Sequence, residues 1–136
     1  MAKFITPLRV VQIDSKRWQL EGAFMYATDV IDRVIVVPNG FITDFASVPR
    51  LPMAYLLTGN KAQAPAVIHD WLYSTHEVER DVADNIFHEA ILAAGHSRFT
   101  AWIMWAGVRS FGWHAWDKPN LKQPMHIELP VLPEQA

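Results

Sequence analysis

The chain has 136 residues, of which 51% are hydrophobic, and this is enough to build the core of one domain. Its formal net charge of −2 and the lack of any run of Lys or Arg argue against a nucleic-acid-binding surface, so we expect no nucleic-acid partner. The sequence contains no cysteine, which excludes disulfides, thiolate metal sites and a cysteine nucleophile.

Neither a signal peptide nor a transmembrane segment is predicted. The first twelve residues, MAKFITPLRVVQ, have no long apolar stretch and no small-residue cleavage site. The apolar run AWIMWAGV, at 101–108, is much shorter than the roughly 18 residues that span a bilayer. We therefore expect a protein made in the cytoplasm, which would leave its cell only by lysis or by assembly into a particle.

The first half of the chain predicts β-strands at 8–13, 17–28 and 33–41. These segments are rich in Val, Ile and aromatic residues and are separated by polar or turn residues. The apolar run Val34–Val37 favours a strand that is covered on both faces. Pro38-Asn39-Gly40 is typical of a turn. The following segment indicates a loop that leads into a short helix ending near residue 57.

The second half predicts helices. Pro65 suits the start of a helix over 66–75, and Thr75 is the candidate N-cap of a second helix that ends near Ala94, before Gly95. A third helix is expected over 98–111, ending at Gly112. The tryptophans of this last region, at positions 102, 105, 113 and 116, are interpreted as helix packing rather than as a sugar-binding platform.

The fold class that follows is α+β. An N-terminal antiparallel β-sheet precedes a three- or four-helix C-terminal part. We expect one domain over residues 1–116. The proline-rich remainder, 117–136, is expected to be an extended C-terminal arm that could pair with a partner.

Polar residues recur at helical spacing within this apolar second half. Residues three or four apart share a face of a helix, as His69 and Tyr73 do. Arg80, Asp84 and His88 form a ladder of such steps on the next helix. The link between the two helices is short, so they should pack as an antiparallel hairpin with His69 opposite Asp84 or His88.

Three interpretations of this cluster remain open. In the first, His69 is a general base whose tautomer is fixed by Asp84, while Asp70, turned about 100° away on the helix, binds a hard cation such as calcium. In the second, His69, Asp84 and His88 bind zinc or another divalent ion. In the third, the cluster is a buried network that fixes helix register, and Arg80–Asp84 is only an ion pair.

Four motifs resemble a family of uncharacterised proteins of tailed phages and prophages. They are GFITDFASVPR, AVIHDWLY, RDVADNIFHEA and VRSFGWHAW, and the similarity covers most of residues 30–116. The resemblance implies a phage or prophage origin, synthesis in the host cytoplasm and possible incorporation into the virion. It implies other phage structural proteins as partners and no established activity.

A shorter stretch, His69-Asp70-Trp71-Leu72-Tyr73, is similar to the His-Asp helix of secreted phospholipases A2, and Arg80-x-x-x-Asp84-x-x-Phe87 to the second helix of their bacterial and fungal members. By that resemblance His69 activates water, Asp84 orients it, Tyr73 hydrogen-bonds the carboxylate and Asp70 binds calcium. The chain departs from the enzymes in lacking cysteines and a glycine-rich calcium loop. Its candidate loop, 39–48, offers Asp44, with Ser47 and Arg50 as supporting residues.

Two functions are therefore expected. One is a small hydrolase that acts on the cell envelope, with a phospholipid ester as the specific substrate and a peptidoglycan bond as the broader one. The other is a non-catalytic virion, tail or assembly protein whose many aromatic residues form interfaces.

Overall fold

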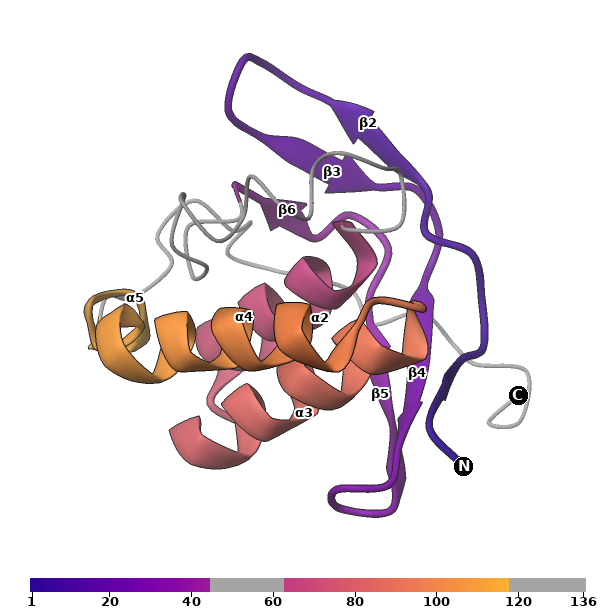
Figure 1. The fold of residues 1–136 in the computed structure, drawn as a ribbon. Coiled ribbons are helices and arrows are strands. Elements are labelled where there is room, and N and C mark those ends of the chain that lie inside the picture. The colour runs from indigo at the N-terminus through magenta and orange to yellow at the C-terminus, as the bar shows by residue number, and fades with distance from the viewer. Residues whose placement is uncertain (45–62, 118–136) are drawn as a thin grey trace.

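The computed structural model describes residues 1–44 and 63–117, and it confirms the α+β class (Figure 1). The N-terminal residues form two antiparallel sheets of three strands. One has the order β1-β4-β5 and the other β2-β3-β6. Their bounds are β1 Lys3–Phe4, β2 Val10–Gln12, β3 Trp18–Leu20, β4 Phe24–Thr28, β5 Arg33–Val37 and β6 Ile42–Thr43.

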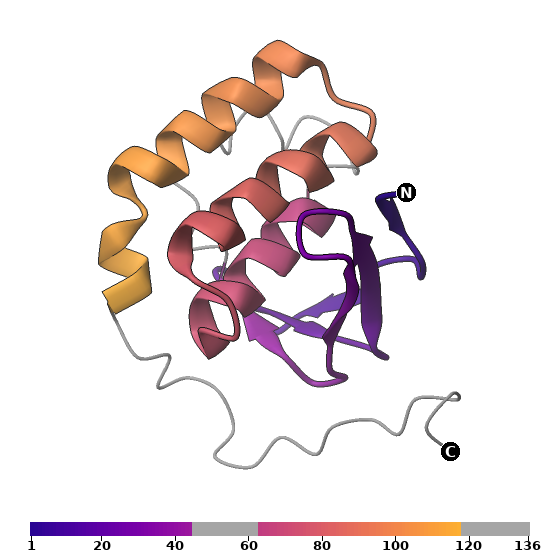
Figure 2. The same cartoon turned by 90° about the horizontal axis from the view of Figure 1, so that it is seen from below.

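The helices follow as α2 Gln63–Thr75, α3 Arg80–Ala93, α4 Arg98–Phe111 and α5 Trp113–Asp117. Helices α2 and α3 form the expected hairpin and pack on the strands. Helix α4 packs on α3 and lies farthest from the strands, along the outer edge of the helical layer (Figure 2). None of the helices in the described ranges is long and apolar enough to cross a bilayer.

The strand predictions need three corrections. The segment 17–28 is not one strand, because Gly22, at φ +87°, breaks it into β3 and β4, which belong to different sheets. The short edge strand β1 was not predicted. The run Val34–Val37 is not covered on both faces, since Val34 is 45% exposed while Ile35 and Val37 are buried.

One helix boundary also differs from the prediction. Thr75 is not the N-cap of α3 but the last residue of α2, where its hydroxyl donates to the carbonyl of Trp71. Glu79 is the N-cap residue, and His76 takes a positive φ of 55° in the turn between the helices. The end of α4 at Gly112 is confirmed, but the chain resumes at once as α5 because Gly112 has helical backbone angles.

The core lies between the strands and the helical hairpin. Its largest buried side chains come from β4, β5 and the segment before β6 on one side, and from α2, α3 and α4 on the other: Phe24, Tyr26, Ile35, Phe41, Ile68, Leu72, Phe87, Ile91 and Met104. Glu89 on α3 adds a polar connection to β4. It accepts hydrogen bonds from the Tyr26 hydroxyl at 2.8 Å and the Thr28 hydroxyl at 2.7 Å.

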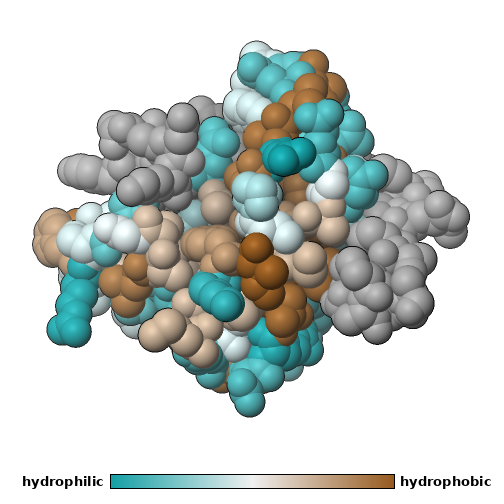
Figure 3. Space-filling view, turned by 90° about the vertical axis from the view of Figure 1, so that its right-hand side faces the viewer, coloured by the Kyte–Doolittle hydropathy of each residue, from teal (hydrophilic) through white to brown (hydrophobic). Residues whose placement is uncertain are grey.

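The side of the molecule that Figure 3 shows carries hydrophobic residues at its centre and along the part that extends upward. A groove of about 400 Å³ is lined by Phe4, Thr6, Pro7, Leu8, Val10, Phe24, Gln63 and Ala64. It lies where the chain passes from β1 to β2, beside the start of α2. Its lining residues include none of the charged side chains of the helical hairpin.

Candidate functional site

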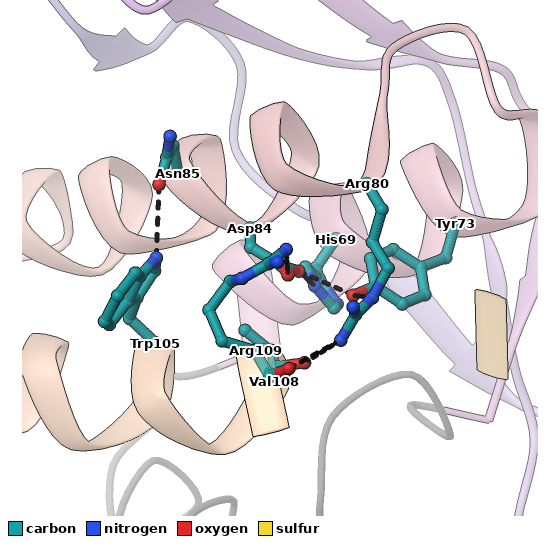
Figure 4. A network of polar contacts seen from close by, with 8 residues as sticks. All are labelled: His69, Tyr73, Arg80, Asp84, Asn85, Trp105, Val108 and Arg109. Carbon is teal, nitrogen blue, oxygen red and sulfur yellow. Dashed lines mark hydrogen bonds and ion pairs between the residues drawn. The ribbon is translucent and has the colours of Figure 1, made fainter. Parts of the chain in front are cut away.

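The hairpin brings His69 of α2 against Asp84 of α3, as predicted. His69 Nε2 lies 2.7 Å from Asp84 Oδ1, and both side chains are fully buried (Figure 4). The two side chains come into contact because His69 is near the middle of α2 and Asp84 is one turn into α3. A link of four residues folds the two helices back on each other.

Two further side chains complete the bonding of Asp84. The Tyr73 hydroxyl, one turn after His69, donates to the same Oδ1 at 2.6 Å. Arg109, near the end of α4, donates from Nη1 to Oδ2 at 2.8 Å. Three helices therefore meet at one carboxylate.

Arg80 ties the same group to the end of α4. Its Nη2 donates to the carbonyls of Val108 and Arg109, at 2.8 Å each, and its Nε donates to the Tyr73 hydroxyl at 3.2 Å. Carbonyls in the last turn of a helix have no partner within the helix, so a guanidinium is well placed there. The predicted ion pair between Arg80 and Asp84 is replaced by this arrangement, and it is Arg109 that pairs with Asp84.

The charges of the network follow from its contacts. Burial would raise the pKa of Asp84, but the hydrogen bonds from His69, Tyr73 and Arg109 outweigh it, so that the pKa lies below its usual value. Burial, and then the hydrogen bond to Asp84, raise the pKa of the Tyr73 hydroxyl. An ionised Asp84 can only accept hydrogen bonds, so in this contact His69 Nε2 is the donor to Oδ1. His69 takes part in at least one further interaction.

Asp70 lies outside this network. Its Oδ2 accepts a hydrogen bond from the Thr43 hydroxyl at 2.6 Å, so it faces β6 rather than α3. This agrees with the expectation that neighbouring helix positions point in different directions. Asp44 follows Thr43 in the chain, and both residues, like Asp70, have further interactions. Ser47 and Arg50 lie outside the described residues.

A metal site does not form among the described residues, where no group of three His, Asp or Glu side chains is arranged to hold an ion. His88 is half-buried and makes none of the contacts of the network. His69 and Asp84 meet without His88, and the zinc prediction, like the calcium one, stays a prediction. The calcium prediction depends in part on residues 45–48, which are not described, and stays a prediction.

Sequence reasoning missed two important residues. Arg109 lies on the third predicted helix, but nothing in the sequence fixes how α4 crosses α3. Glu89, rather than its neighbour His88, makes the long-range contacts of that turn of α3. A signal for Glu89 was available, since it lies between the buried positions Phe87 and Ala90 in a stripe that faces the strands.

The fold and the site define an α+β protein that carries a buried His–Asp pair on a helical hairpin. The family described as "Protein of unknown function (DUF1353)" matches residues 18–108, which include His69, Tyr73 and Asp84. The chain belongs to this family. No curated protein and no solved structure matches it.

Proposed function

We propose that the protein is a small phage- or prophage-encoded hydrolase of the cell envelope, with a phospholipid ester as its substrate and His69 as its general base. One observation carries the proposal: a single oxygen of Asp84 receives both His69 Nε2, at 2.7 Å, and the Tyr73 hydroxyl, at 2.6 Å. This is the arrangement that the similarity to the His-Asp helix of phospholipases A2 implies. The four phage-like motifs support the origin.

The chemistry would use the imidazole of His69, which is fully buried in this structure, so a water molecule must reach it when substrate binds. That water gives a proton to the ring while its oxygen attacks the ester carbonyl carbon. The tetrahedral intermediate then loses the alcohol oxygen, which takes the proton from His69, and a fatty acid and an alcohol result. Asp84 stabilises the positive imidazolium during the transfer and holds the ring in one orientation.

Release of fatty acid from phospholipid vesicles tests the proposal, with wild type, His69→Gln and Tyr73→Phe compared. Loss of the base should lower the rate by more than about 100-fold, whereas Tyr73→Phe keeps both base and orienting carboxylate and should retain more activity. Glu89→Gln is the matched control, because it alters a buried polar contact of α3 outside the network. If the folded wild type hydrolyses no lipid, with or without added calcium or zinc, the proposal is rejected for lipids. The same variants assayed on peptidoglycan test the broader substrate.

A specific observation favours a second candidate, a non-catalytic virion, tail or assembly protein. His69 and Asp84 are both fully buried. Arg80 and Arg109 hold α4 against the hairpin, as expected of a network whose role is to stabilise the fold. In this case the wild type hydrolyses neither lipid nor peptidoglycan, and His69→Gln lowers the melting temperature. Mass spectrometry of purified virions would detect the protein, and its absence from them would count against a virion component.

A further inference from the structure

Large aromatic side chains are exposed along α4 and at the start of α5. Phe99 is 69% exposed, Trp102 57%, Phe111 66% and Trp113 49%. We call these four residues the α4 surface. Their exposure contradicts the expectation that tryptophans 102 and 113 pack within the helical layer, and it is unusual for a stable folded domain to leave several such side chains in water.

The geometry of α4 explains the exposure. Its buried residues, Ala101, Met104 and Val108, recur at helical spacing and pack on α3. By the same spacing Phe99 and Trp102 lie on the other side of the helix, and both are exposed; α4 itself runs along the outer edge of the helical layer (Figure 2). A helix whose inner and outer faces are both apolar has a second apolar contact to make.

Charge is distributed unevenly around this surface. The protein has 14 acidic residues and a net charge of −2, yet the 27 residues from 90 to 116 contain no Asp or Glu. The same stretch contains Arg98 and Arg109. Arg109 is engaged with Asp84, while Arg98 is exposed beside Phe99. Within the described residues, the part of the α4 surface around Phe99 and Trp102 carries Arg98 and no carboxylate from its own segment, whereas the exposed Asp117 lies one turn after Trp113.

From these observations we infer that the α4 surface lies on the interface of an anionic phospholipid bilayer. Tryptophan and phenylalanine favour the region between lipid headgroups and acyl chains, and an amphipathic helix lies in the plane of that region. Anionic headgroups attract an adjacent arginine. A second copy of the chain is the alternative occupant, and the test below distinguishes it from a bilayer. The inference deepens the proposed function, on which it rests for the identity of the substrate, by stating how the protein reaches that substrate.

Vesicle binding tests this inference without requiring activity. The full chain is sedimented with vesicles of mixed phosphatidylglycerol and phosphatidylcholine, and with phosphatidylcholine alone. We expect binding to the anionic vesicles, and a loss of about tenfold or more in the variant Phe99→Ser/Trp102→Ser. The matched control is Val11→Ser/Val34→Ser, which removes two side chains, 46% and 45% exposed, from the strands and should bind like wild type.

Several outcomes would overturn the inference. These are the absence of vesicle binding by the wild type, equal binding by both double variants, or equal binding to the two kinds of vesicle. A dimer that dissociates in Phe99→Ser/Trp102→Ser without any vesicle binding would assign the surface to a second copy. The His69→Gln variant separates the two proposals, since it should bind vesicles as wild type does even if the wild type proves to hydrolyse nothing.

Discussion

At the scale of single residues, the carboxylate of Asp84 organises the candidate site. It receives hydrogen bonds from His69, Tyr73 and Arg109, and none of its own surface is exposed. Because its ionised form is stabilised by each of these donors, removing the charge should affect all three at once.

The first prediction concerns Asp84→Asn, which keeps the shape of the side chain and removes its charge. Asparagine keeps only one of the two acceptor oxygens and no charge, so Arg109 loses its ion pair and one oxygen's donors lose their acceptor, and we expect the free energy of unfolding to fall by about 3 kcal/mol. Tyr73→Phe should cost about 1–2 kcal/mol, because the hydroxyl's bonds to Asp84 and from Arg80 are both lost. Urea unfolding measures both, and the double variant should cost less than the sum. Additive losses would contradict a shared network.

The second prediction concerns Asp70 and calcium. If the calcium assignment is right, calcium should raise the melting temperature of the wild type and not that of Asp70→Asn. Asp84→Asn is the comparison, since it alters a buried carboxylate of the network and should keep the calcium response. A melting temperature of the wild type that calcium leaves unchanged would remove Asp70 from the set of metal ligands.

The candidate site was predictable as far as local geometry reaches. Helical spacing and a short link place His69 opposite Asp84 or His88, and the packing of the two helices selects Asp84. Arg109 could not be assigned, because its contact depends on the crossing of α4 over α3, which packing decides. Glu89 was not anticipated; it reaches β4 because it lies one position, about 100° around the helix, from His88.

At the scale of elements, the hairpin is held to α4 and α5 by close packing around Gly112. A Cβ atom at this position would lie 2.7 Å from the Tyr73 hydroxyl and would also meet the Val108 carbonyl. The absence of a side chain thus lets the end of α4 approach α2. His76, in the turn after α2, stacks on Trp116 of α5 with ring centroids 3.7 Å apart and fixes the same end.

The third prediction is that Gly112→Ala destabilises the protein by about 1–3 kcal/mol, because either Tyr73 or the end of α4 must shift. The exposed Ser110→Ala, two residues earlier on α4, is the matched control and should change stability by less than about 0.5 kcal/mol. Thermal unfolding measures both. Equal stability of Gly112→Ala and wild type would show that the contact relaxes without cost.

The elements themselves were predictable where their signal is local. Helical periodicity and Gly112 gave the bounds of α4, and the α+β order follows from the change of period along the chain. The division of 17–28 between two sheets was not predictable, because it depends on the positive φ of Gly22 and on its bond to Asn39. The two-residue strand β1 is too short to carry a pattern.

At the scale of the whole molecule, ionisation of buried groups limits the range of pH in which the fold is stable. Burial, and then the hydrogen bond to Glu89, raise the pKa of Tyr26, as burial does for Tyr73. Both hydroxyls stay protonated in the folded protein at a pH where the unfolded chain loses those protons. Asp84 behaves in the opposite sense, since its pKa is lowered on folding.

The fourth prediction follows from these signs. Above about pH 10 the unfolded chain releases the two tyrosine protons that the folded protein keeps, so stability should fall by about 1.4 kcal/mol per pH unit for each tyrosine. Below about pH 4 the unfolded chain protonates its Asp84 first, and the stability from this carboxylate is lost as pH falls further. Urea unfolding at a series of pH values measures both the alkaline and the acidic loss of stability. Tyr73→Phe should halve the tyrosine contribution on the alkaline side, and an unchanged slope would contradict it.

The contact between Arg109 and Asp84 also bears on where the protein can be cut. The segment that matches the family ends at residue 108, one position before the arginine that pairs with the central carboxylate. It begins at residue 18, after the strands β1 and β2 that pair with β4 and β3. A fragment made to those boundaries would leave Asp84 without its cation and both sheets short of a strand. The folding unit is therefore larger than the segment that matches the family, and truncated chains for experiments should extend at least through α5.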